Sequence, residues 1–125
     1  MKRIALLIAL VPSVALADKS YNSEQSATHD CNKDPVVSIN ASGGTFTLTG
    51  TCDKVGINGS SNTVTIESVK KLGVNGASNK ADVGAAEKIG VSGSSNTITY
   101  KTGLGGKGKP KVGSVGVGNK VTQVK

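Results

Sequence analysis

The stretch Val55-Gly-Ile-Asn-Gly-Ser-Ser-Asn62 recurs twice with little change, over residues 72–79 and 89–96, each copy 17 residues after the last. A fixed period of this length is typical of repeat proteins, in which each unit buries its apolar face only by stacking on its neighbours. The repeated stretch is therefore expected to set the architecture of the chain.

Apolar residues alternate with small or polar residues in both halves of each repeat. Val55 and Ile57 lie in the first half, and Val64 and Ile66 lie in the second. Alternation of β-branched residues predicts two short strands per unit, each with one face buried. Gly and Asn adopt positive φ with little strain, so a sharp turn is expected between the strands. The predicted turn residues are Gly59, Asn62, Gly76, Asn79, Gly93, Asn96 and Asn119.

The pattern continues beyond the three clear copies. An 18-residue step towards the N-terminus aligns the apolar residues of 37–48 with those of 55–66, which indicates an earlier unit. Towards the C-terminus, Val115 and Val117 align with Ile89 and Val91. Two irregularities are expected there, an inserted Gly- and Lys-rich loop over residues 103–112 and a last turn shortened to Gly118-Asn119.

Units of this kind predict an all-β fold, a small parallel β-solenoid of about four rungs with two short strands each. An antiparallel β-sandwich or small barrel is the alternative. Stacked rungs explain the pattern better, because equivalent positions touch directly only when rungs stack. The turn asparagines would then line up and could hydrogen-bond in a ladder.

The first 17 residues have the form of an export signal. Lys2 and Arg3 precede an apolar stretch that is too short to span a bilayer, and Ala15-Leu16-Ala17 is a small-residue cleavage site. The mature chain is therefore expected in the periplasm or outside the cell, with no transmembrane segment. It would consist of a polar N-terminal segment, 18–35, and a repeat domain, 36–125.

Composition narrows the functional classes. The net charge of +7 falls to +5 once Lys2 and Arg3 are removed, and the remaining chain has no Arg and no Trp. Nucleic-acid recognition relies heavily on Arg and aromatic side chains, so it is not expected. The single His and the scattered carboxylates form no catalytic or metal-binding motif, which predicts a non-catalytic protein without metal or cofactor.

Cys31 and Cys52 are the only two cysteines of the chain. In an exported protein such a pair predicts an intramolecular disulfide. His29 is interpreted as an ordinary polar residue of the N-terminal segment.

The outward positions are where binding is expected. Gly56, Gly73, Gly90 and Gly116 would form a stripe without side chains, either covered by the N-terminal segment or a second molecule or simply easing the bend of the rungs. Lys107, Lys109 and Lys111 would offer a basic loop to an anionic envelope polymer. The opposite face carries Thr pairs, but Lys80 and Asp82 interrupt them, which argues against ice binding. Asn rather than Asp at the turns argues against calcium.

The repeated phrase Ile/Val-x-Gly-x-x-Asn-x-Val/Ile, over residues 37–101 and more loosely 115–121, resembles the bacterial family of domains of unknown function numbered 3060. That resemblance implies a secreted or envelope location and a repetitive β fold, and supplies no catalytic residues. The sequence thus favours a structural or interaction protein of the cell envelope that contacts a polymer or its own copies. A secreted module that binds a carbohydrate or another envelope ligand is the alternative.

Overall fold

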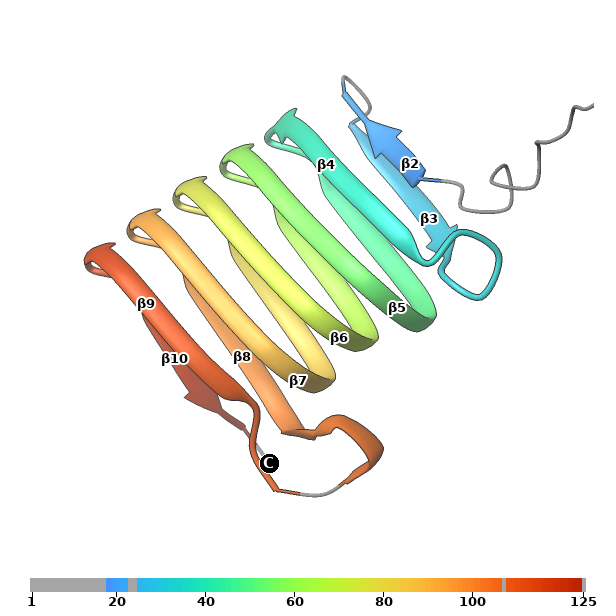
Figure 1. The fold of residues 1–125 in the computed structure, drawn as a ribbon. Helices are drawn as coiled ribbons and strands as arrows, with labels where there is room; N and C mark the ends of the chain where they lie inside the picture. Colours follow the sequence, from blue (N-terminus) through green and yellow to red (C-terminus); the bar gives the residue numbers. More distant parts are fainter. Residues whose placement is uncertain (1–17, 23–24, 107, 125) are drawn as a thin grey trace, which may run out of the picture.

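The computed structural model describes residues 18–22, 25–106 and 108–124, and these are almost entirely β-strand (Figure 1). The predicted signal segment, 1–17, and Lys107 lie outside the described residues. The elements are β2 (Asp18–Tyr21), β3 (Ser26–Asp30), β4 (Val36–Ser42), β5 (Thr45–Ser60), β6 (Thr63–Ala77), β7 (Lys80–Ser94), β8 (Thr97–Gly103), the 3-10 helix η3 (Leu104–Gly106), β9 (Lys111–Val117) and β10 (Lys120–Gln123).

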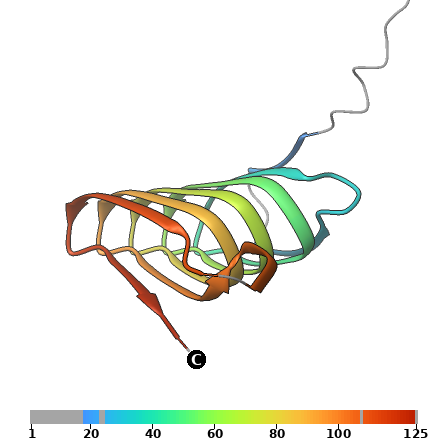
Figure 2. The ribbon, with the colours of Figure 1, turned by 60° about the horizontal axis from the view of Figure 1, so that its bottom comes forward.

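The strands pair in parallel, and the chain winds into a flattened coil of about five turns (Figures 1 and 2). Val37, Val55, Leu72 and Ile89 stand in one register row, which reproduces the steps of 18 and 17 residues seen in the sequence. The predicted parallel β-solenoid is confirmed, and the expected number of about four rungs is close to the observed number of about five turns. The antiparallel sandwich or barrel is wrong, because no antiparallel pair joins the described strands.

Each turn of the coil has two arms. The first arm contains the repeated stretch and is formed by β2, β4, the second halves of β5 to β7, and β9. The second arm is formed by β3, the first halves of β5 to β7, β8 and β10. The two short strands expected per unit correspond to these arms. In β5, β6 and β7, however, the second arm of one turn runs through a bend into the first arm of the next.

The core is a thin double row between the arms. Its first-arm side includes Val37, Val55, Leu72 and Ile89, and its second-arm side includes Phe46, Val64, Ala81 and Ile98, all nearly inaccessible to solvent. Burial of a Val, Leu or Ile side chain contributes about 1.5–3 kcal/mol. Because each row continues from turn to turn, every turn depends on its neighbours for this burial.

The strands β2 and β3 belong to the first turn of the solenoid. β2 pairs with β4 and β3 with β5, so Tyr21 stands beside Ile39 and His29 beside Leu48. Both rings are buried in these inward positions. The expected boundary at residue 36 is corrected by this pairing, and His29 is a core residue rather than an ordinary polar one.

The C-terminal register also differs from the expectation. Val112 and Ser114, not Val115 and Val117, stand opposite Ile89 and Val91. The insertion is shorter than predicted, since residues 104–110 replace the single residue Glu87 of the preceding turn. The last sharp turn, between β9 and β10, is not shortened, because Gly118 and Asn119 take the places of Ser95 and Asn96.

Candidate functional surfaces

The predicted asparagine ladder is present at the sharp turn. The Oδ1 atoms of Asn62, Asn79, Asn96 and Asn119 each accept a backbone N–H from the preceding turn. Each Nδ2 donates to a backbone carbonyl of the preceding turn. Asn62, Asn79 and Asn96 are buried, so these bonds satisfy polar groups that water cannot reach. The ladder holds the fold together and leaves no donor directed at a ligand.

The turn glycines are required by two constraints at once. Gly59, Gly76, Gly93 and Gly116 have φ between 118° and 126°, a region that L side chains rarely adopt. A Cβ on Gly76 would also overlap the carbonyl oxygen of Gly59 in the preceding turn. Gly116 was expected in the outer glycine stripe, and the structure corrects this, because it stands opposite Gly93. Gly113 takes its place in the stripe, opposite Gly90.

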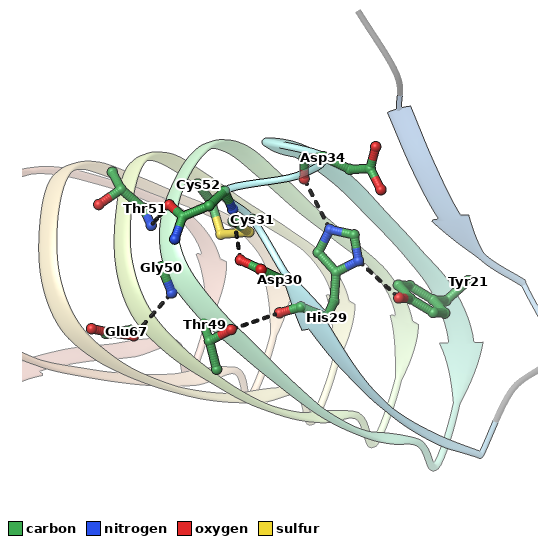
Figure 3. The surroundings of a disulfide bond; sticks show 11 residues. Tyr21, His29, Asp30, Cys31, Asp34, Thr49, Gly50, Thr51, Cys52 and Glu67 are labelled. Atoms are coloured by element: carbon green, nitrogen blue, oxygen red, sulfur yellow. Dashed lines mark hydrogen bonds between the residues drawn. A yellow bond between two sulfur atoms is a disulfide. The ribbon is translucent and has the colours of Figure 1, made fainter. Parts of the chain in front are cut away.

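The N-terminal turn is closed by a disulfide and two rings (Figure 3). Cys31 and Cys52 form the predicted disulfide, which joins the bend of the first turn to the bend of the next. Nε2 of His29 lies 2.9 Å from the Asp34 carbonyl oxygen, and its Nδ1 lies 2.9 Å from the Tyr21 hydroxyl. A carbonyl only accepts, so in the neutral ring Nε2 carries the proton and Tyr21 donates to Nδ1. These contacts assign His29 a structural role.

The outer surface of the first arm combines a glycine row with a column of lysines. Gly56, Gly73, Gly90 and Gly113 stand in register, and a Cβ on any of them would meet no atom within 4 Å. Of the alternatives offered for this stripe, cover by the N-terminal segment does not fit, because its strands β2 and β3 pair with β4 and β5 as a further turn of the coil. The lysine column stands two residues before the glycines and consists of Lys54, Lys71, Lys88 and Lys111.

The four column lysines are exposed. Adjacent members are about 4.8 Å apart at the backbone, and like charges placed directly opposite one another are destabilising. Within the part of the chain that the structure describes, the one salt bridge joins Lys70 to Asp53 on the neighbouring outward row, at 3.4 Å, and includes none of the four. The column is therefore a line of positive charge without carboxylate partners.

The glycine row makes the floor of a shallow groove beside this column. One depression of about 380 Å³ is lined by Lys71, Lys88 and Lys111 together with Gly90 and Gly113. The next, of about 370 Å³, runs along the same glycines to Asn75, Ser92 and Val115. The groove thus has ammonium groups on one side and amide or hydroxyl groups on the other.

Two of the lysines that were predicted to form one basic loop lie in different parts of the structure. Lys111 starts β9 and belongs to the lysine column, whereas Lys109 is an exposed residue of the inserted loop. The sequence signal for the column was present and was missed: Lys54, Lys71 and Lys88 each immediately precede a copy of the repeated stretch.

The outer surface of the second arm has a different character. A depression of about 460 Å³ on this surface has Thr47, Thr65, Glu67, Asp82, Thr99 and Lys101 among its lining residues. The Thr99 hydroxyl donates to Asp82 Oδ1 at 2.7 Å, so the interrupting carboxylate is held in the row of hydroxyls. This polar surface is the second place where a ligand could be bound.

The fold and the ladder together define a small parallel β-solenoid in which the sharp turn between the two arms is built around an asparagine. A family model described as a protein of unknown function (DUF3060) matches residues 39–80 and 71–118. These overlapping matches span more than half of the chain, which therefore belongs to this family. Neither the curated proteins nor the solved structures give a match. Among the described residues no helix is long and apolar enough to cross a membrane.

Proposed function

We propose that this protein is an exported, non-catalytic interaction protein of the cell envelope that binds a linear anionic polymer along its lysine column. The observation that supports the proposal is the register of Lys54, Lys71, Lys88 and Lys111, which aligns four exposed ammonium groups along the solenoid axis. A polymer with repeated carboxylate or phosphate groups would neutralise several of them at once and would relieve their mutual repulsion.

The glycine row supports a polymer rather than a compact ligand. A groove with a floor of Gly73, Gly90 and Gly113 is open along the axis, so an extended chain can lie against the backbone without meeting side chains. On the far side of the groove, Asn58 and Asn75 are hydrogen-bonded to each other at 3.3 Å and present a regular polar border. Affinity would come mainly from charge, and would therefore fall steeply with salt.

Polygalacturonate, a linear carboxylated polysaccharide, is a suitable probe, with uncharged dextran as its counterpart. We expect the full chain to bind polygalacturonate at low salt and not to bind dextran. Replacing the two central lysines, as Lys71→Gln with Lys88→Gln, should weaken binding by about tenfold at low salt and flatten the salt dependence.

The matched control is Lys80→Gln with Lys120→Gln. These lysines are also exposed, and they stand in one register row on the second arm, so the control removes the same charge from the other side of the molecule. Equal loss of binding in both double variants would show that only net charge matters, and the lysine column would then be rejected as the binding surface.

A second candidate function is a module that binds a carbohydrate or another envelope ligand. The depression beside Thr65, Asp82 and Thr99 favours it, because convergent hydroxyl and carboxylate groups suit the hydroxyls of a neutral sugar. Retention on a glycan array that persists at high salt and is abolished by Asp82→Ala would favour this function over the first.

A further inference from the structure

The two ends of the solenoid are built differently. The N-terminal end is closed by the Tyr21 and His29 rings, which are edge-to-face at 5.8 Å between centroids, and by the disulfide. The C-terminal end has no comparable cover among the described residues. The exposed large hydrophobic residues of the described chain all lie in its last turn, with exposed fractions of 45% for Val112, 70% for Val115, 77% for Val117 and 37% for Val124.

The last turn also has open strand edges. Among the strands that the structure describes, β9 pairs only with β7, and β10 pairs only with β8, so each has a neighbour on one side. An open edge is a template for pairing with another chain, and repeat proteins ordinarily protect it with a polar capping unit. Here the inserted loop does not supply the cap, because η3 packs against β6, β7 and β8 instead.

Charge indicates which partner fits this end. After Glu87 the sequence has seven lysines and no acidic residue, whereas residues 18–35 have four acidic residues and two lysines. A tail-to-tail pair would bring two lysine-rich ends together. A head-to-tail pair would instead bring the basic end of one copy onto the acidic end of the next.

The strand order fits the same arrangement. At both ends a first-arm strand is followed in the chain by a second-arm strand, and among the described strands β2 and β3, like β9 and β10, each pair with one neighbour. We infer that copies of this chain stack head to tail, with β9 and β10 of one copy adding in parallel onto β2 and β3 of the next.

The register of the existing turns fixes the expected contacts. Continuing the first arm by one turn places Val115 beside Asn22 of the next copy, and continuing the second arm places Val121 beside Ala27. At the sharp turn, the carbonyls of Asn62, Asn79 and Asn96 accept the N–H groups of Lys80, Thr97 and Lys120 in the following turn. Asn119 is the next acceptor in this series, and Ser26 of the next copy is the corresponding donor.

This contact has no closing symmetry, so it generates open chains of copies rather than a closed dimer. Sedimentation of the full chain, expressed with residues 1–17 so that any processing proceeds naturally, should show species that grow with concentration. Val115→Glu with Val117→Glu should abolish this growth, because both side chains are exposed and the new charges would face the acidic end. Ser92→Glu with Ser94→Glu, the equivalent positions one turn inside the end, should not.

Cross-linking tests the polarity of the contact. A mixture of Val115→Cys and Asn22→Cys chains should give a mixed product with a short thiol-reactive cross-linker, whereas each variant alone should give little. A predominant Val115→Cys homodimer would show tail-to-tail pairing and would overturn the inference, and so would a wild-type chain that stays monomeric at every concentration. The inference does not rest on polymer binding, because the lysine-column variants are scored in a separate assay.

Discussion

Nδ2 of Asn79 donates a hydrogen bond to Oδ1 of Asn96 at 3.1 Å, joining two successive turns through their side chains. Asn79 also donates to the Gly59 carbonyl and accepts from the backbone N–H of Asn62. One buried side chain thus satisfies polar groups on both neighbouring turns, and its removal would leave several of them without partners.

We therefore expect Asn79→Ala to lower the free energy of unfolding by about 3 kcal/mol, since each unsatisfied buried group costs about 1–3 kcal/mol. Asn75→Ala is the matched control. Asn75 is exposed, its amide donates to Asn58 at 3.3 Å, and water can replace that bond. Urea unfolding of the two variants measures the difference, and equal losses of stability would contradict a structural role for the buried ladder.

A second prediction contrasts two glycines in one repeat. Gly76 has a φ of 126° and faces the Gly59 carbonyl oxygen, whereas Gly73 has open space around it. Gly76→Ala should therefore destabilise the protein by about 3 kcal/mol or more, from backbone strain together with the steric overlap. Gly73→Ala should change stability by less than about 1 kcal/mol. Thermal unfolding followed by circular dichroism distinguishes the two, and a tolerated Gly76→Ala would show that the turn can rearrange.

The inner turns of this fold were predictable because their rule is local and repeated. Steps of 17 residues place Val55, Leu72 and Ile89 in one row, and the same steps place Asn62, Asn79 and Asn96 in line. Wherever the repeat is regular, one register determines both the core and the ladder.

The ends were less predictable because end turns need not repeat the pattern. In the first turn Tyr21 and His29 replace aliphatic residues, so the alternation that marks a strand is weak there. In the last turn Val115 and Val117 match the pattern as apolar residues, but only the chain path through the inserted loop decides that Val112 faces inward. The lysine column was not predicted, because its exposed charged residues share the period of the core but are not part of the apolar alternation that indicates strands.

The disulfide allows a third prediction. Cys31 and Cys52 enclose a loop with a sequence separation of 21, and in the chain-entropy model such a cross-link contributes about 3 kcal/mol. Unfolding in urea with and without a reducing agent should show a loss of this size. The double variant Cys31→Ser with Cys52→Ser should match the reduced protein and should not respond to the reductant. A response in that variant would mean that the reductant acts elsewhere.

Ser78 supplies a fourth prediction. Its φ is 56°, in the left-handed region, and the equivalent position in the last turn is Gly118, with a φ of 73°. Left-handed backbone costs a non-glycine residue about 1–2 kcal/mol, and glycine loses about 0.5–1 kcal/mol more conformational entropy on folding. Ser78→Gly should therefore stabilise the chain by about 0.5 kcal/mol, and Ser78→Val should destabilise it. Stabilisation by the valine would contradict the assigned conformation.

The lysine column leads to a last prediction, in which stability and binding change in opposite directions. Without a polymer, Lys71 and Lys88 repel each other across neighbouring strands, and the described residues provide no carboxylate to either. Lys88→Gln should raise the unfolding free energy by about 0.5 kcal/mol at low salt, and this gain should shrink as salt screens the repulsion. The same variant should bind polygalacturonate more weakly.

Lys80→Gln serves as the control, because Lys80 stands between Thr63 and Thr97 rather than beside another lysine. If Lys88→Gln destabilised the chain at low salt, the repulsion that a bound polyanion is proposed to relieve would not exist.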